Sequence, residues 1–108
     1  MTYHEDKLDA LGDPTRRAVL KILRRGPMSV GEIARQFSVS RPAISQHLRV
    51  LKDAGLVTSS PDATRRVYAI DHEGFESLRS YFDDFWSSAL DSFQRHVESK
   101  RSSRKRPA

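Results

Sequence analysis

The first quarter of the chain alternates short apolar stripes with residues that begin or end helices. Residues 3–11 predict a first helix that is short and mostly polar, so we expect it to be stable only when packed against the rest of the chain. Asp13 and Pro14 then predict the start of a second helix, and Gly26 and Pro27 predict its end. The buried stripe of this second helix is expected to be Ala18, Val19, Ile22 and Leu23.

Residues 29–55 hold two further apolar-periodic segments, separated by a short break. Ser29 and Glu32 have the spacing of a capping box, in which each side chain bonds a free backbone N–H at a helix start. Ser40 is placed to cap the second helix, and Gly55 stands where a left-handed residue ends it. Two helices of this length joined by a short turn predict a helix-turn-helix.

The second helix of this pair has two chemically different faces. Ile44, Leu48 and Leu51 are predicted to face the core. The opposite face is small, hydrogen-bonding or cationic, and its one acid, Asp53, lies at the far end. Because a carboxylate beside phosphate is repelled, a face without acids is suited to a DNA groove. We therefore expect this surface to bind DNA through Ser40, Arg41, Pro42, Ala43, Ser45, Gln46 and Arg49.

The side chains on this face match the chemistry of base edges. Gln46 can bond adenine through two hydrogen bonds, and Ala43 can contact the methyl group of thymine. Arg41 or Arg49 can reach guanine or a backbone phosphate. The alternative is a plain solvated helix, because helix-turn-helix shapes also occur in proteins that do not bind DNA.

A hairpin is predicted directly after this helix. Residues 56–58 and 65–70 are rich in β-branched side chains, and the segment 60–63 between them predicts a turn. A hairpin behind a recognition helix is the wing of a winged helix, and Arg65 or Arg66 can reach phosphate or a minor groove. The alternative is that this arginine pair only keeps the hairpin soluble.

Asp71 is placed to cap a long last helix over residues 72–99. Its apolar positions cover about half of the helix circumference, which is wider than the ~100° stripe that a helix usually turns toward its own core. We expect the surplus surface to pair with a second copy around a two-fold axis, with help from the first helix. In the alternative, the first helix covers it within one chain. The predicted interface is Tyr3, Leu8, Leu78, Phe82, Phe85, Trp86, Ala89 and Phe93.

The composition restricts the class of protein. The 108 residues suit one mainly helical domain with a small hairpin, predicted over residues 1–99. The absence of cysteine excludes disulfides, thiolate metal sites and thiol redox switches. No apolar run approaches the ~18 residues that span a bilayer, and the N-terminus has no signal-peptide character, so we expect a cytoplasmic protein without a membrane partner.

The formal net charge of +5 is unevenly distributed along the chain. Residues 16–66 carry eleven bases and three acids, whereas residues 67–99 carry two bases and seven acids. A basic centre that coincides with the helix-turn-helix indicates a phosphate-binding face. Residues 100–108 carry five bases and no acid, and we expect them to form a disordered basic tail that contacts DNA backbone or has no role.

Three segments together resemble the ArsR-type winged-helix repressors. They are LGDPTRRAVLKIL, SVGEIARQFSVSRPAISQHLRVLKDAGLV and RRVYAI, and the resemblance covers residues 8–70. It implies a winged helix-turn-helix, a homodimeric bacterial regulator, an imperfect palindromic operator in double-stranded DNA, and repression released by a signal. It also implies that His47 packs at the inner edge of the recognition helix.

The chain departs from that family in the parts that sense a signal. Metal-sensing members carry cysteines on the first helix of the helix-turn-helix, where this chain has residues 32–36 without cysteine. Other members bind metal on the terminal helix, and the nearest candidates here, Asp84, Asp91 and His96, do not share one side of the helix. Only a ligand from the partner chain, such as His4, keeps that possibility open. We predict no metal site or cofactor, and the sequence identifies no small-molecule inducer.

Two other functions are alternatives to a DNA-binding repressor. A winged-helix module that binds an acidic protein would show only weak, sequence-independent DNA affinity. An enzyme would need a phosphate loop or a catalytic group with its base, and the sequence shows neither, so we predict no catalytic residues.

Overall fold

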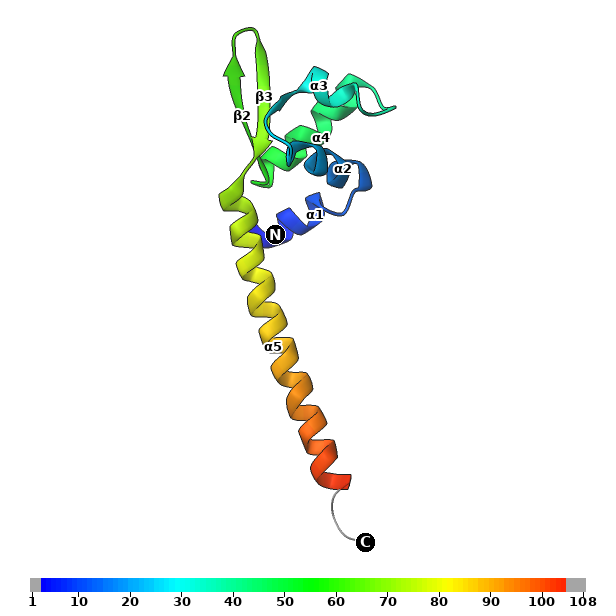
Figure 1. Ribbon diagram of the computed structural model, residues 1–108, viewed down its shortest axis with the longest axis vertical. Coiled ribbons are helices and arrows are strands. Elements are labelled where there is room, and N and C mark those ends of the chain that lie inside the picture. Colours follow the sequence, from blue (N-terminus) through cyan, green and yellow to red (C-terminus); the bar gives the residue numbers. More distant parts are fainter. Residues whose placement is uncertain (1–2, 105–108) are drawn as a thin grey trace. The chain divides into compact units, whose positions relative to one another are not determined.

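The computed structural model describes residues 3–104 and divides the chain into two units, one that ends at Leu78 and one that begins at Arg79. Four helices and a small sheet precede one long helix, and the predicted order of elements is confirmed. In chain order the elements are α1 (Tyr3–Ala10), α2 (Pro14–Leu23), β1 (Met28–Ser29), α3 (Val30–Ala34), α4 (Arg41–Asp53), β2 (Val57–Asp62), β3 (Arg65–Ile70) and α5 (His72–Arg104) (Figure 1).

Each predicted cap is present at its helix. The Asp13 carboxylate accepts a hydrogen bond from the Arg16 N–H at 3.0 Å at the start of α2. The Ser40 hydroxyl accepts one from the Ala43 N–H at 3.3 Å at the start of α4. Gly55, with φ 80°, ends α4 in the left-handed conformation that glycine adopts without steric cost. These local signals therefore determine where α2 and α4 begin and where α4 ends.

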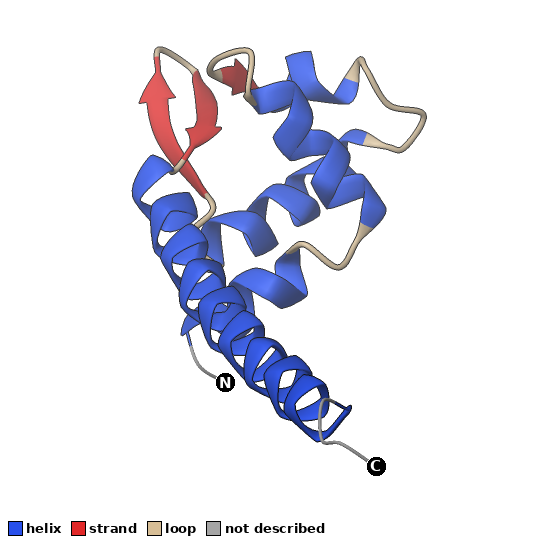
Figure 2. Ribbon diagram, turned by 60° about the horizontal axis from the view of Figure 1, so that its bottom comes forward, coloured by secondary structure: helices blue, strands red, loops and turns tan. Residues whose placement is uncertain are grey.

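The sheet has three antiparallel strands in the order β1-β3-β2, one more than the predicted hairpin (Figure 2). The extra strand, β1, consists of two residues and pairs with Tyr68 and Val67. The predicted turn at 60–63 begins three residues too early, because β2 continues to Asp62 opposite Arg65. Pro61 is accommodated because β2 is an edge strand, where a missing N–H removes no ladder bond to an outer neighbour.

The core of the first unit forms where α2, α3, α4 and β2 meet. Ile44, Leu48 and Leu51 of α4 are fully buried, as predicted. In α2 the buried residues are Val19, Leu20 and Leu23. The expected stripe is therefore shifted, since Ala18 and Ile22 are only half-buried. The direction in which α2 faces is decided by its packing against α4 and β3, which the period of its sequence does not specify.

Helix α5 begins in the first unit. The Asp71 carboxylate accepts a hydrogen bond from the Gly74 N–H at 3.1 Å, which confirms the predicted cap. The helix continues to Arg104, five residues beyond the predicted end, because the chain from Lys100 on has no glycine or proline to stop it before Pro107. Residues 100–104 are thus helical rather than part of the expected tail, and residues 105–108 lie outside the described residues. Between residues 3 and 104, no helix combines the length and the apolar character that a bilayer crossing requires.

Candidate nucleic-acid interface

The exposed face of α4 is built by the first three turns of that helix. Arg41, Pro42, Ser45, Gln46 and Arg49 are all exposed and line a shallow hollow together. Because Ile44 and Leu48 are fully buried on the other side, the core holds this helix in one rotation about its axis. The structure thus brings five of the predicted DNA-binding residues onto one surface. Of the other two on this helix, Ser40 is exposed at the cap and Ala43 is half-buried.

The acidic groups near α4 lie at its other end. Asp53 is the last residue of the helix and lines a separate hollow with Asp6 and Asp9 of α1. No acidic residue occurs between Arg41 and Lys52. The hollow formed by Arg41 to Arg49 is therefore cationic and hydrogen-bonding, as expected of a surface that approaches phosphates.

The capping box at the start of α3 also holds the wing. The Ser29 hydroxyl accepts from the Glu32 N–H, while the Glu32 Oε1 atom accepts from the Ser29 N–H at 3.2 Å and from the Ser29 hydroxyl at 2.9 Å. The same oxygen accepts a hydrogen bond from the Arg65 guanidinium at 3.0 Å. These bonds, above all those from Ser29, lower the pKa of Glu32 below its ordinary value. A single carboxylate oxygen thus joins α3 to the first residue of β3.

The structure therefore separates the two wing arginines. Arg65 donates to Glu32 and, at 3.3 Å, to Asp62, so both ends of its guanidinium contact carboxylates. Arg66 donates to the Ser59 hydroxyl at 3.3 Å and is exposed. That Arg65 or Arg66 reaches phosphate stays a prediction, and of the two only Arg65 has carboxylate partners among the contacts described. Sequence reasoning missed the pairing of Arg65 with Glu32, because residues 33 positions apart give no local signal.

A second polar contact joins α4 to the start of α2. The His47 Nδ1 atom lies 3.9 Å from the Asp13 carboxylate, and both side chains are partly exposed. The backbone N–H of Arg16 is the main reason why the pKa of Asp13 is lowered, and His47 adds a smaller effect. His47 thus lies half-buried at the flank of α4, beside Asp13, which caps α2.

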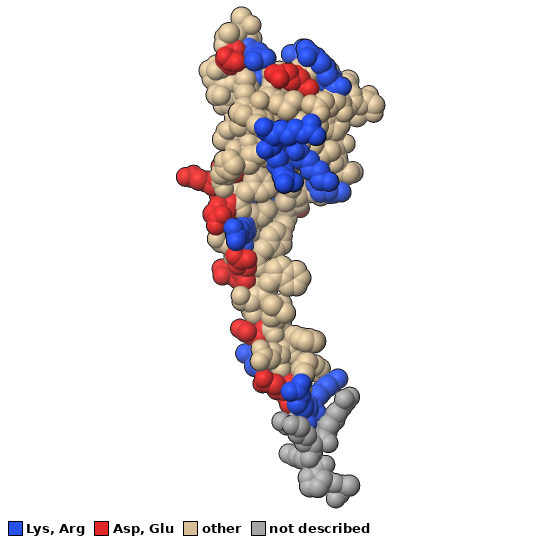
Figure 3. All heavy atoms as spheres, in the orientation of Figure 1, with Lys and Arg blue, Asp and Glu red and all other residues tan. Residues whose placement is uncertain are grey.

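The basic residues of α2 have two different roles. The Arg16 Nε atom donates to the Ala10 carbonyl at 2.7 Å, and an Arg17 nitrogen donates to the Leu11 carbonyl at 2.8 Å. These two arginines therefore satisfy carbonyls that the end of α1 leaves unpaired. Lys21 of α2 and the two arginines just after it, Arg24 and Arg25, are exposed, and Lys and Arg side chains gather over α2 in Figure 3.

The residues of the predicted dimer interface differ in how far they are exposed. Leu78 is only 4% exposed, so its own chain already covers it, which removes it from the predicted interface. Leu8 is half-buried, and the side chain of Tyr3 lies outside the described ones. In the second unit, Phe85, Trp86 and Phe93 are more than half exposed, Phe82 is 36% exposed and Ala89 is half-buried. We call Phe82, Phe85, Trp86, Ala89 and Phe93 the α5 stripe.

The candidate metal ligands are not brought together. Across residues 3–104 the structure contains no group of three histidine, aspartate or glutamate side chains arranged to hold a metal ion. His4, the candidate ligand from a partner chain, forms a hydrogen bond of 3.2 Å with the Ser77 hydroxyl of its own chain.

Comparisons with known proteins agree with this geometry. A family model described as "Bacterial regulatory protein, arsR family" matches residues 13–59. The chain is 50% identical over 91 residues to the HTH-type transcriptional regulator Rv2034 of Mycobacterium tuberculosis, covering 84% of this chain and 85% of that protein. It is 47% identical over 49 residues to the transcriptional repressor SdpR of Bacillus subtilis, covering 45% of this chain and 54% of that protein.

Solved structures show the same architecture. The solution structure of the homodimeric winged helix-turn-helix DNA-binding domain of Mb0332 from Mycobacterium bovis is similar with a TM-score of 0.64 and 26% identity, over 82% of this chain and 80% of that one. The order of elements, the capped helix α4 and the 50% identity over 91 residues with Rv2034 all point to the same family. The chain belongs to the ArsR family of bacterial regulatory proteins, which are DNA-binding transcriptional regulators and not enzymes.

Proposed function

We propose that the chain is a homodimeric transcriptional repressor that binds an imperfect palindromic operator in double-stranded DNA and senses no metal through cysteine. The observation that carries this proposal is the surface of α4 from Arg41 to Arg49, which is exposed, contains no acid and is held in one orientation by a fully buried opposite face. Such a surface fits the major groove, where Gln46 and the arginines can bond base edges. Repression is proposed because SdpR, which is 47% identical over 49 residues, is named a repressor.

The α5 stripe supports the homodimer. Phe85, Trp86 and Phe93 are 55%, 57% and 65% exposed, although large aromatic side chains gain most from burial. A continuous apolar surface of this kind on a small protein indicates an interaction site. A second copy offers the same surface around a two-fold axis, and the homodimeric Mb0332 domain sets a precedent among similar structures. A dimer with one α4 in each half-site then explains why the operator would be palindromic.

The experiment that tests this function is selection of binding sites from a pool of random duplexes by the purified protein at about 150 mM salt, followed by sequencing. We expect a palindrome whose half-sites are centred about 10 bp apart, or a multiple of that spacing. If no motif is recovered, the DNA binding rests on charge alone. The alternative, a winged-helix module that binds an acidic protein, would then be favoured. A transcription assay with the recovered site upstream of a reporter would then separate repression from activation. Because DNA is the partner, we place the protein in the cytoplasm.

A further inference from the structure

A second hollow of the first unit lies away from the DNA-binding surface. It is a groove of about 640 Å³ between the end of α1, one face of α2, the end of β3 and the first turn of α5. This volume falls within the range of sites that hold small organic molecules. It shares no residue with the hollow on α4. We propose that this groove binds an amphipathic carboxylate, a small molecule with an apolar body and an anionic head.

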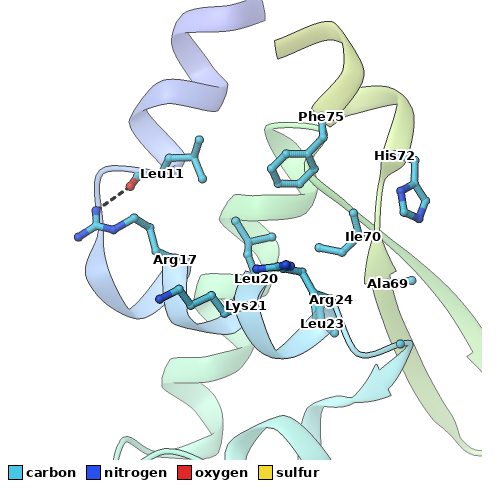
Figure 4. Close-up of a pocket in the computed structure, with 11 residues that line it drawn as sticks. Leu11, Arg17, Leu20, Lys21, Leu23, Arg24, Ala69, Ile70, His72 and Phe75 are labelled. Carbon is cyan, nitrogen blue, oxygen red and sulfur yellow. Dashed lines mark hydrogen bonds between the residues drawn. The ribbon is translucent and has the colours of Figure 1, made fainter. Parts of the chain in front are cut away.

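The floor of the groove is apolar and comes from four elements. Leu11 follows α1, Leu20 lies on α2, Ile70 ends β3 and Phe75 lies in the first turn of α5, and their side chains point toward one another in Figure 4. Leu20 is buried, while the other three are partly exposed at the edge of the core. An apolar body seated here would cover surface that the fold itself leaves in contact with water, and the removal of apolar surface from water favours binding.

The rim of the groove is cationic on one side. Arg17 and Lys21 of α2 and Arg24, the residue that caps its end, follow one another at helical spacing, and Figure 4 shows them along one edge of the floor. None of the residues that line the groove is acidic. Arg17 is positioned by its hydrogen bond to the Leu11 carbonyl, and Lys21 and Arg24 form no ion pair with a carboxylate in the part of the chain that is described. A cationic edge beside an apolar floor selects a ligand that is anionic at one end only.

The apolar floor and the cationic rim together disfavour ligands that match only one of them. A DNA phosphate would bond the α2 cations but would leave the floor of Leu11, Leu20, Ile70 and Phe75 in contact with water. A neutral apolar molecule would fill the floor but would gain nothing from the rim. Decanoate contains both features in one small molecule and is therefore the probe for the test. Decanol has nearly the same chain without the charge, and acetate has the charge without the chain.

The test is a titration of the isotope-labelled full chain with each probe, followed by NMR of the backbone amides. We expect decanoate to saturate below its micelle concentration, with the largest shifts at Leu20, Ala69, Ile70 and Phe75. Decanol and acetate should each bind at least about tenfold more weakly, because each lacks one of the two interactions. The combined variant Lys21→Gln/Arg24→Gln should lose about tenfold in decanoate affinity. The matched control Arg25→Gln/Arg35→Gln removes two exposed charges outside the groove and should bind as the unaltered chain does.

A filling variant keeps the proposal testable without removing charge. Ala69→Leu places three more carbons in the groove from a half-buried position near the end of β3, and should abolish saturable decanoate binding while thermal unfolding remains cooperative. Several results would overturn the proposal: equal affinity for decanol, equal affinity for decyltrimethylammonium, or no saturation. Shifts confined to residues 81–93 would also overturn it, because they would show that the chain of the probe binds the exposed aromatics of α5. None of these outcomes depends on DNA binding.

Discussion

The Arg65 guanidinium lies 3.0 Å from the Glu32 Oε1 atom, the same oxygen that accepts two hydrogen bonds from Ser29. This contact joins the first strand residue after the wing turn to the first turn of the helix-turn-helix. Glu32 is thus both half of a capping box and the anchor of the wing. One carboxylate therefore ties the wing to α3, beside the pairing of β1 with β3.

Acid should weaken the fold through Glu32 and Asp13. The pKa of each is lowered in the folded chain, Glu32 chiefly by Ser29 and Asp13 chiefly by the Arg16 N–H. A lowered folded pKa means that the stabilisation is present above the pKa of the unfolded chain and is lost as pH falls through the folded value, so the loss should occur below about pH 4.

The measurement is thermal unfolding between neutral and acid pH. In Glu32→Gln and Asp13→Asn the melting temperature should be lower at neutral pH and should change less as pH falls. Asp91→Asn, on the exposed surface of α5, is the control and should retain the full pH dependence. Unchanged pH profiles in both variants would show that these carboxylates are not bonded in solution.

Gln46→Ala should relax the sequence specificity of DNA binding. Gln46 is exposed in the centre of the α4 hollow, where it can bond one base edge, so its loss should cost about 1–3 kcal/mol at particular base pairs and little elsewhere. Competition binding with a series of single-base operator variants measures this difference. Gln94→Ala removes an exposed glutamine from α5 and should leave every affinity unchanged. An unaltered base preference in Gln46→Ala would contradict the assignment of α4 as the recognition helix.

Arg66→Ala and Arg65→Ala should behave differently. Arg66 is exposed and bonds only a hydroxyl among the contacts described, so its loss should weaken binding to all duplexes alike and reduce the salt slope by about 1. Arg65 contacts Glu32 and Asp62, so Arg65→Ala should also lower the melting temperature in the absence of DNA. The check is binding across a range of salt concentrations together with thermal unfolding. The same melting temperature in both variants would argue against Arg65 as the anchor of the wing.

Trp86→Glu should break the proposed homodimer. A carboxylate on the α5 stripe would have to be buried without a partner, which should weaken dimerisation by at least about a hundredfold. Operator affinity should fall with it, because one half-site offers too few contacts. Sedimentation equilibrium measures the first effect, and Ser87→Glu, at the next exposed position on the other side of the helix, is the control. A monomeric unaltered chain would remove the basis of this prediction.

Gly74→Ala should destabilise the first unit. A methyl group on Gly74 would overlap the carbonyl oxygen of Gly55, the residue that ends α4, so the start of α5 would have to move. Such overpacking costs about 1–3 kcal/mol of unfolding free energy. Gly31→Ala in α3 is the matched control, since a methyl group there meets only the Arg41 side chain at 3.8 Å, and the removal of glycine from a helix should stabilise by about 0.5–1 kcal/mol. Urea unfolding of both variants measures the difference in sign.

Local chemistry made much of the candidate site predictable. Asp13, Ser29, Ser40 and Asp71 cap their helices as predicted, because a cap needs only a side chain within three residues of a free N–H. Ile44, Leu48 and Leu51 are buried as predicted, because α4 is long enough for its 3.6-residue period to identify one face. Arg41, Gln46 and Arg49 are exposed because they lie on the face of α4 opposite these buried residues.

Two short elements have features that their own sequence does not indicate. Helix α1 buries Lys7 and Ala10, while its apolar Leu8 is only half-buried, since eight residues define a face too weakly to resist the packing around them. The two-residue strand β1 has no pattern of its own and exists because Met28 and Ser29 lie beside Tyr68 and Val67.

The sequence by itself determined where α2, α3, α4 and α5 begin, where α4 ends, the buried face of α4 and the acid-free surface opposite it, because each depends on residues within about two helical turns of one another. Only the tertiary structure decided that Arg65 bonds Glu32 while Arg66 remains exposed, that Gly74 lies against Gly55, and that α2 and Phe75 enclose a basic-edged groove. These features join residues that lie far apart in the chain. No local period encodes such distances, and the contacts form only when the whole core has packed.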